Sequence, residues 1–178
     1  MMKMIKFLVL TLTLVVISPP ISIYADKILM ARECHNARFP TTCMQCLESD
    51  PTSLHATPYG IAGIVINCLE SHLHILTNNI TELLVKKQKG DTTKSALVYC
   101  KKYLTAALKF LPYAKTSLKN GKYDMAGRTI AFALMFPIRC EDILETAKFE
   151  KFEYPEIYNQ INLYGQLSDA AMRIIDRF

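Results

Sequence analysis

Apolar residues recur three, four and seven positions apart along four long segments of the chain, which is the spacing of amphipathic helices. The clearest segment ends at Asn120-Gly121, and it contains four leucines that fall seven residues apart. Its predicted buried positions are Leu97, Cys100, Leu104, Ala107, Leu111, Ala114 and Leu118. An apolar stripe that persists over more than three turns is typical of a helix in a bundle.

Three further segments show the same kind of pattern. One begins after Thr57-Pro58, which looks like an N-cap followed by a proline in the first turn. Another begins near Tyr123, and Pro137 is expected to bend it or divide it in two. The last begins at Pro155, and its predicted buried positions include Ile157, Ile161, Tyr164, Leu167, Ala171, Ile174, Ile175 and Phe178.

Two shorter helical segments precede these four. Residues 26–37 and 43–48 are compatible with helix, and Pro40 interrupts the chain between them. No run of alternating polar and apolar residues indicates a strand. The sequence therefore predicts an all-α fold, with an N-terminal helical hairpin over residues 26–56 and an up-and-down four-helix bundle over residues 57–178.

The first 25 residues have the layout of a secretory signal peptide. Lys3 and Lys6 precede an apolar run from Phe7 to Ser18, and Ala25 offers a small residue for cleavage. The run is too short to span a membrane, which takes about 20 apolar residues. We therefore expect residues 1–25 to be removed, leaving a secreted single domain over residues 26–178 with no membrane segment.

Charge narrows the range of partners. The formal net charge of +5 falls to +3 when the two lysines of the signal peptide are removed. A net charge of +3 is too small to indicate nucleic-acid binding. A mildly basic surface could attract an acidic partner or an anionic cell-wall matrix, but most such surface charge is simply solvated. Asn79-Ile80-Thr81 is an N-glycosylation sequon, which agrees with secretion.

Six cysteines in a secreted domain are read as a set of disulfides. Cys100 and Cys140 each lie 20 residues from Asn120, so an antiparallel helical hairpin brings them to the same level. Cys34 and Cys43 flank the break at Pro40, where a bridge would clamp the short hairpin. These considerations favour the pairs Cys34–Cys43 and Cys100–Cys140.

The remaining cysteines, Cys46 and Cys68, either pair with each other or stay free and buried. A competing interpretation is a zinc site, because Cys43-x-x-Cys46 followed by Cys68-x3-His72 has ligand-like spacing. In a secreted protein disulfides are favoured, and we expect no metal and no cofactor.

These features together resemble the plant invertase/pectin methylesterase inhibitor family, over the whole mature chain. The resemblance rests on the two cysteine spacings of nine and forty residues inside four helices that follow a signal peptide. The matching segments are residues 47–53 (LESDPTS), Ala96-Leu97-x2-Cys100, Leu111, Ala114, Tyr123-x2-Ala126, Ala133-Leu134 and Cys140-Glu141-Asp142. It implies the same two disulfides and a protein that inhibits a cell-wall enzyme by one-to-one docking.

The resemblance implies two classes of target, pectin methylesterase and acid invertase. Invertase inhibitors can carry Pro-Lys-Phe at the start of the third bundle helix, where this chain has Gly121-Lys122-Tyr123, so pectin methylesterase is favoured. Other departures are Leu104 in place of a tyrosine, Arg139 in place of a threonine, and the additional Cys46 and Cys68. The expected location is the apoplast or cell wall, with the vacuole as the alternative.

The turn after Asn120 is the predicted partner-binding site, through Lys122, Tyr123 and Asp124. Tyrosine is enriched in binding hot spots, and a turn on a clamped hairpin loses little entropy when it docks. The alternative is a solvated turn with Tyr123 folded back onto the bundle. If the turn does not bind, the exposed flanks of the same two helices are the next candidate.

The sequence gives no indication of an enzyme. It has no nucleophile elbow, zinc-protease motif, P-loop or dinucleotide glycine motif. Glu141 and Asp142 are adjacent, so on a helix they point about 100° apart and cannot face each other as an acid–base pair. Two function classes remain: a macromolecular enzyme inhibitor, and a non-inhibitory helical ligand-binding or structural cell-wall protein.

Overall fold

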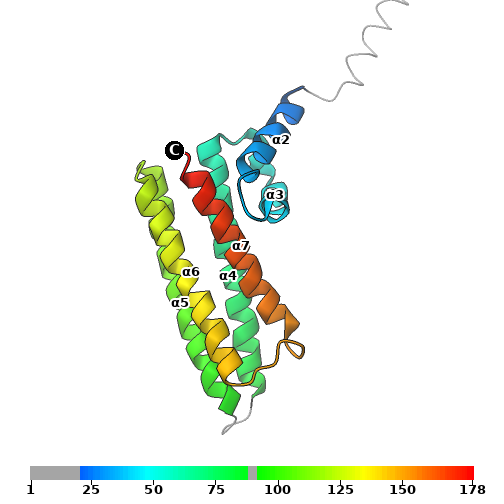
Figure 1. The fold of residues 1–178 in the computed structure, drawn as a ribbon, viewed down its shortest axis with the longest axis vertical. Coiled ribbons are helices and arrows are strands. Elements are labelled where there is room, and N and C mark those ends of the chain that lie inside the picture. Colours follow the sequence, from blue (N-terminus) through cyan, green and yellow to red (C-terminus); the bar gives the residue numbers. More distant parts are fainter. Residues whose placement is uncertain (1–20, 88–91) are drawn as a thin grey trace, which may run out of the picture.

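The computed structural model describes residues 21–87 and 92–178, and within these ranges the regular structure is entirely helical (Figure 1). The predicted all-α fold is therefore confirmed. The elements are α2 (Ile21–Cys34), α3 (Pro40–Ser49), the short 3₁₀-helix η1 (Pro51–His55), α4 (Pro58–Lys86), α5 (Thr92–Lys119), α6 (Tyr123–Thr146) and α7 (Pro155–Ile175).

Helices α4 to α7 form an up-and-down bundle. Each packs against two neighbours, in the order α4–α5–α6–α7 and back to α4. The turn between α5 and α6 lies at the same end of the bundle as the C-terminus and the start of α4 (Figure 1). The α2–α3 hairpin packs on α4 and α7, so α5 and α6 form the side of the bundle away from it.

The predicted apolar stripes form the core. All seven stripe residues of α5 are buried, and so are Ile130, Ala133, Cys140 and Leu144 of α6. Phe178 is the exception, because α7 ends at Ile175 and the Phe178 side chain remains 42% exposed. A seven-residue spacing predicts a face only while the helix continues.

Two prolines act differently from one another. Pro40 is the first residue of α3, a position at which the missing N–H costs no hydrogen bond. Pro137 lies inside α6, which runs as one helix from Tyr123 to Thr146, so of the two expected outcomes, a bend or a division, the division is wrong. The ring of Pro137 is buried in the core, and this burial offsets the hydrogen bond that the helix loses.

The predicted cap at the start of α4 is also confirmed. The Thr57 side-chain oxygen accepts a hydrogen bond from the Gly60 N–H at 3.1 Å, and Pro58 is the first helical residue. Asp50 caps η1 in a similar way, by accepting from the Thr52 hydroxyl and backbone N–H. These two hydrogen bonds, that of the hydroxyl first, lower the pKa of the Asp50 carboxyl.

Three disulfides are present, Cys34–Cys43, Cys46–Cys68 and Cys100–Cys140. The first joins α2 to the start of α3, and the second joins α3 to α4. The third joins α5 to α6 at positions that are both fully buried. The hairpin is therefore linked covalently to the bundle, and the two helices on either side of Asn120 are linked to each other.

The predicted signal peptide falls mostly on residues 1–20, which lie outside the described residues. Among those described, α4 is the one helix long and apolar enough to cross a membrane by length and composition. Nine of its residues are buried, as expected of a core helix in a bundle.

Candidate target-binding surface

The turn between α5 and α6 has a defined backbone. Gly121 adopts a positive φ of 69°, the left-handed conformation that glycine tolerates best. Its N–H donates to the Leu118 carbonyl at 3.0 Å, and the Lys122 N–H donates to the Ser117 carbonyl at 2.9 Å. This pair of hydrogen bonds is a Schellman motif, which ends α5. The next helix, α6, begins at Tyr123, only a few residues later.

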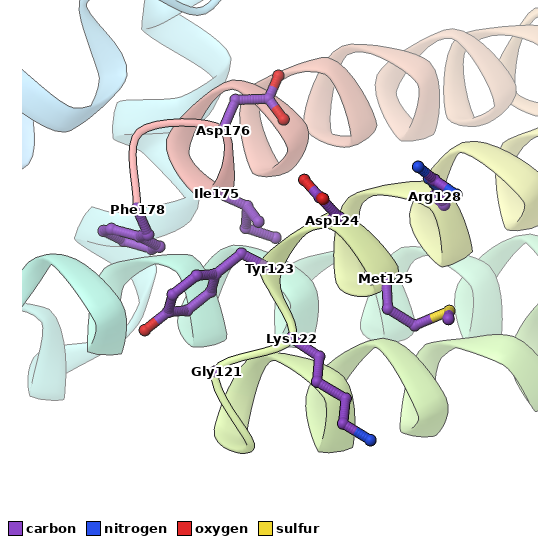
Figure 2. A pocket seen from close by; sticks show the side chains of 9 residues that line it. All are labelled: Gly121, Lys122, Tyr123, Asp124, Met125, Arg128, Ile175, Asp176 and Phe178. Atoms are coloured by element: carbon purple, nitrogen blue, oxygen red, sulfur yellow. The ribbon is translucent and has the colours of Figure 1, made fainter.

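We refer to residues 119–124 as the tip. Within it Lys122 and Asp124 are exposed, whereas Tyr123 is half-buried. The Tyr123 ring packs against the Phe178 ring, with centroids 5.2 Å apart and the planes tilted by 56°. Tyr123 is thus partly folded back onto the bundle, while Lys122 points away from this ring pair (Figure 2).

An open pocket of about 670 Å³ lies beside the tip. It is lined by Gly121, Lys122, Tyr123, Asp124, Met125, Arg128, Ile175, Asp176 and Phe178. The three residues predicted from the sequence, Lys122, Tyr123 and Asp124, thus meet the end of α7 at one surface (Figure 2). The lining combines two aromatic rings with cationic and anionic side chains, and aromatic residues, methionine and arginine are enriched in protein–protein interfaces.

The end of the chain is itself held in place. The Arg177 guanidinium pairs with the Glu33 carboxylate, which is only 4% exposed, and also approaches the Arg32 and Glu33 carbonyls. Arg177 therefore fastens the residues after α7 to helix α2. Phe178 follows directly, so the ring that supports Tyr123 is attached to the rest of the fold rather than to a free end.

Four aromatic residues form a separate cluster between α5 and α6. We call Tyr103, Phe110, Phe132 and Phe136 the ridge. Phe110 lies 4.9 Å from Phe132 and 5.6 Å from Phe136, measured between ring centroids, and Tyr103 lies 6.4 Å from Phe136. Phe132 is 46% exposed. Tyr103, Phe110 and Phe136 are half-buried. The cluster thus leaves partly exposed apolar area, which commonly marks an interaction surface when it is contiguous.

The ridge was not predicted from the sequence. Its signal is a second stripe on α5, where Tyr99, Tyr103, Phe110 and Tyr113 share a side about a quarter-turn from the core stripe. Phe132 and Phe136 occupy the corresponding side of α6. Helical spacing shows each stripe in the sequence. That the two stripes face each other depends on how α5 and α6 are oriented about their own axes, which the structure shows.

The zinc interpretation is wrong. The sulfur atoms of Cys46 and Cys68 are bonded to each other, and Cys43 is bonded to Cys34, so none of them is available as a thiolate ligand. The Nδ1 atom of His72 lies 3.2 Å from the Gln160 side-chain oxygen. Within residues 21–87 and 92–178, no group of three or more metal-ligating side chains comes together.

Several groups with shifted pKa values lie away from the tip and belong to structural contacts. Burial raises the pKa of Tyr164, which lies on α7 and faces the core of the bundle. Burial also raises the pKa of Tyr158, whose hydroxyl donates to the Phe149 carbonyl at 2.6 Å. Hydrogen bonds to Glu145 and then Glu141 raise the pKa of Lys151.

Asn79 of the glycosylation sequon lies on α4 and is half-buried.

We expect Gly121→Ala to destabilise the protein by about 1 kcal/mol, because alanine meets a steric penalty at positive φ. Space is not the cause, since a Cβ added at Gly121 would meet no atom within 4 Å. Gly63→Ala is the matched control: it also meets no atom within 4 Å and lies inside α4. Alanine there should stabilise by roughly 0.5–1 kcal/mol. Chemical denaturation measures both, and two shifts of the same sign would contradict the assigned turn.

The chain forms a small disulfide-stapled helical domain with a rigid turn at one end of the bundle and an aromatic ridge on α5 and α6. The model of the family described as "Plant invertase/pectin methylesterase inhibitor" matches residues 29–174, and the chain belongs to this family. The family consists of enzyme inhibitors, which agrees with the absence of catalytic motifs from the sequence.

Known relatives agree with this assignment. A pectinesterase inhibitor from Actinidia deliciosa is 28% identical over 174 residues, which cover 96% of this chain and 86% of the relative. A mutant form of a pectin methylesterase inhibitor from Arabidopsis has a TM-score of 0.66 at 15% identity, covering 83% of this chain and 95% of its own. A second such inhibitor, from Arabidopsis thaliana, has a TM-score of 0.58 at 15% identity, with coverages of 83% and 93%. At these identities the two structures show the shared fold alone.

Proposed function

We propose that this protein is a secreted inhibitor of a plant pectin methylesterase and that it acts by docking one-to-one on the enzyme. The observation that carries the proposal is membership of the inhibitor family over residues 29–174. The relative from Actinidia deliciosa, named a pectinesterase inhibitor, aligns with 96% of the chain. The choice of pectin methylesterase over acid invertase rests on that relative and on the departure of Gly121-Lys122-Tyr123 from Pro-Lys-Phe.

The tip supports a docking role because its geometry is fixed before the enzyme arrives. The Schellman motif holds its backbone, the Cys100–Cys140 disulfide holds the two helices behind it, and Phe178 supports Tyr123. A surface that is already ordered loses little conformational entropy on binding. The exposed Lys122 and Asp124 and the edge of the Tyr123 ring then provide charged and aromatic contacts.

The ridge supports a larger interface than the tip could make alone. A stable protein–protein contact buries about 800 Å² on each partner, usually around an apolar centre. The tip contributes mostly polar side chains, whereas Phe110, Phe132 and Phe136 provide apolar area on the adjoining helices. We propose that the enzyme contacts the tip first and the near part of the ridge beside it.

We also propose how the chain is processed and where the mature protein acts. Residues 1–25 act as a signal peptide, residues 26–178 form the inhibitor domain, and the mature protein works in the apoplast or cell wall. Asn79 is a glycosylation acceptor on the outside of the bundle, where α4 leaves it half-exposed. It lies outside the tip and the ridge, so a glycan at Asn79 is compatible with docking there.

Titration of the mature protein against a plant pectin methylesterase and an acid invertase tests the function. We expect pectin methylesterase activity to fall in proportion to added protein until about one equivalent is present, with acid invertase much less affected. Inhibition of the invertase alone would reverse the proposed target. If a large molar excess leaves both enzymes fully active, the alternative of a non-inhibitory ligand-binding or structural protein holds instead.

A further inference from the structure

Helix α5 carries an unusually uniform charge. Over its 28 residues it contains six lysines and no acidic residue. The lysines are Lys94, Lys101, Lys102, Lys109, Lys115 and Lys119. The rest of the mature domain carries a net charge of −3, because residues 26–178 have a formal charge of only +3 and α5 contributes +6. The positive charge of the molecule is therefore concentrated on one helix.

These lysines cover the solvent-facing part of the helix in two rows about 100° apart, one of Lys94, Lys101, Lys115 and Lys119 and one of Lys102 and Lys109. Lys94 and Lys101 are seven residues apart, as are Lys102 and Lys109, and Lys101 and Lys119 are separated by five full turns. Spacings of this kind return to nearly the same direction on a helix. Tyr103 and Phe110 of the ridge lie about 100° around the helix from Lys102 and Lys109, and roughly opposite the other row. A partner bound at the ridge would leave that opposite row accessible.

Most of this charge is not neutralised within the fold. Lys115 pairs with Glu70 of α4, and the Lys94 ammonium donates to the Lys87 carbonyl at 3.1 Å. Lys102, Lys109 and Lys119 are exposed and have no ion-pair partner within the described residues. From Lys94 to Lys119 the array extends for about 37 Å at the usual helical rise. It is a long row of cations, not a single anion pocket.

We propose that the lysine side of α5 binds an acidic polysaccharide, namely a polymer of uronic acid with free carboxylates. A long linear row of cations matches a linear polymer that carries an anion on each repeat unit. Lysine suits this role because it is a flexible, well-hydrated point charge, whereas specific bidentate recognition would favour arginine. Lysine is also depleted from the centres of protein–protein interfaces, which argues against a second protein as the occupant.

The choice of a uronate polymer rests on the proposed function. A pectin methylesterase converts methyl esters into free carboxylates, so the polymer that fits α5 is the product of the proposed target. Binding would hold the inhibitor where the enzyme has already acted. Apart from Lys119, which belongs to the tip, the lysines of α5 lie outside the tip and the ridge, so one molecule could contact the polymer and the enzyme together.

The test compares two polymers and three proteins without using the enzyme. Binding of the mature chain to polygalacturonate and to highly methyl-esterified pectin of similar length is measured at low and at high salt. We expect binding to polygalacturonate to be at least about tenfold tighter, and to weaken steeply with salt as bound counterions are released. Lys102→Glu/Lys109→Glu should weaken this binding by about tenfold or more, because it reverses two adjacent unpaired charges.

Lys27→Glu/Lys148→Glu is the matched control, since both lysines are exposed, lie outside α5, and change the net charge equally. It should bind polygalacturonate nearly as the wild type does. Equal binding to both polymers, an equal loss in the two variants, or tighter binding to duplex DNA of matched charge would overturn the proposal. The α5 variant should still inhibit the target enzyme, so failure here is distinguishable from failure of the inhibitor function.

Discussion

Cys100→Ser is expected to lower the free energy of unfolding by about 4 kcal/mol, which, together with Cys140→Ser at the same disulfide, is the largest loss among the six single cysteine substitutions. The reason is the length of chain that this disulfide closes. Cys100 and Cys140 are separated by 40 positions, compared with 22 for Cys46–Cys68 and 9 for Cys34–Cys43. In the chain-entropy model a longer loop restricts the unfolded chain more. Both positions are also fully buried, so a serine hydroxyl there would lack water.

Thermal and denaturant melts of the six Cys→Ser proteins measure this order. The double variant Cys100→Ala/Cys140→Ala serves as the control, because it removes the disulfide without leaving a reactive thiol or a buried hydroxyl. It should still lose most of the stability. A Cys100→Ser protein that melts like the wild type would contradict the assigned role of this pair, as would a larger loss from Cys34→Ser.

Lys122→Glu/Tyr123→Ala is expected to weaken inhibition of the target enzyme by about 1–3 kcal/mol, or about 5- to 160-fold in the inhibition constant. The double change reverses the exposed charge of the tip and removes its aromatic ring. Tyr123 also packs on Phe178, so part of any effect could come from a disturbed turn. Melting curves must therefore show that the double variant remains as stable as the wild type or nearly so.

Tyr123→Phe separates the two roles of this side chain, since it keeps the ring against Phe178 and removes only the hydroxyl. It should melt like the wild type and lose only a small part of the inhibition. If the double variant is folded and inhibits at full strength, the enzyme does not contact the tip. Phe132→Ala in the ridge would then be the variant to measure next, because Phe132 is the most exposed ridge ring at 46%.

Most of the fold could be predicted from the sequence, because the four helices depend on local spacing. The seven buried residues of the α5 stripe, the cap at Thr57 and the turn at Gly121 all follow from patterns within a few residues. The pairing of Cys100 with Cys140 needed only one long-range assumption, an antiparallel hairpin centred on Asn120. The continuation of α6 past Pro137 was harder to predict, because burial of the proline ring outweighs the backbone hydrogen bond that the helix loses there.

The surface was less predictable than the core. The tip could be named because a turn with a lysine and a tyrosine is visible in the sequence, but its support by Phe178 and Arg177 could not. Those residues contact Tyr123 and Glu33, which lie 55 and 144 positions earlier in the chain. The ridge likewise depends on how α5 and α6 are rotated about each other. Sequence periodicity defines faces, whereas functional surfaces depend on which faces become neighbours.

The proposed function requires that this protein form a one-to-one complex with a pectin methylesterase. Size-exclusion chromatography with light scattering measures it directly, using an equimolar mixture of the mature chain and the enzyme. We predict a single species whose mass is the sum of one copy of each protein, with little of either protein left free. Separate elution of the two proteins under conditions in which the enzyme is active would contradict the claim.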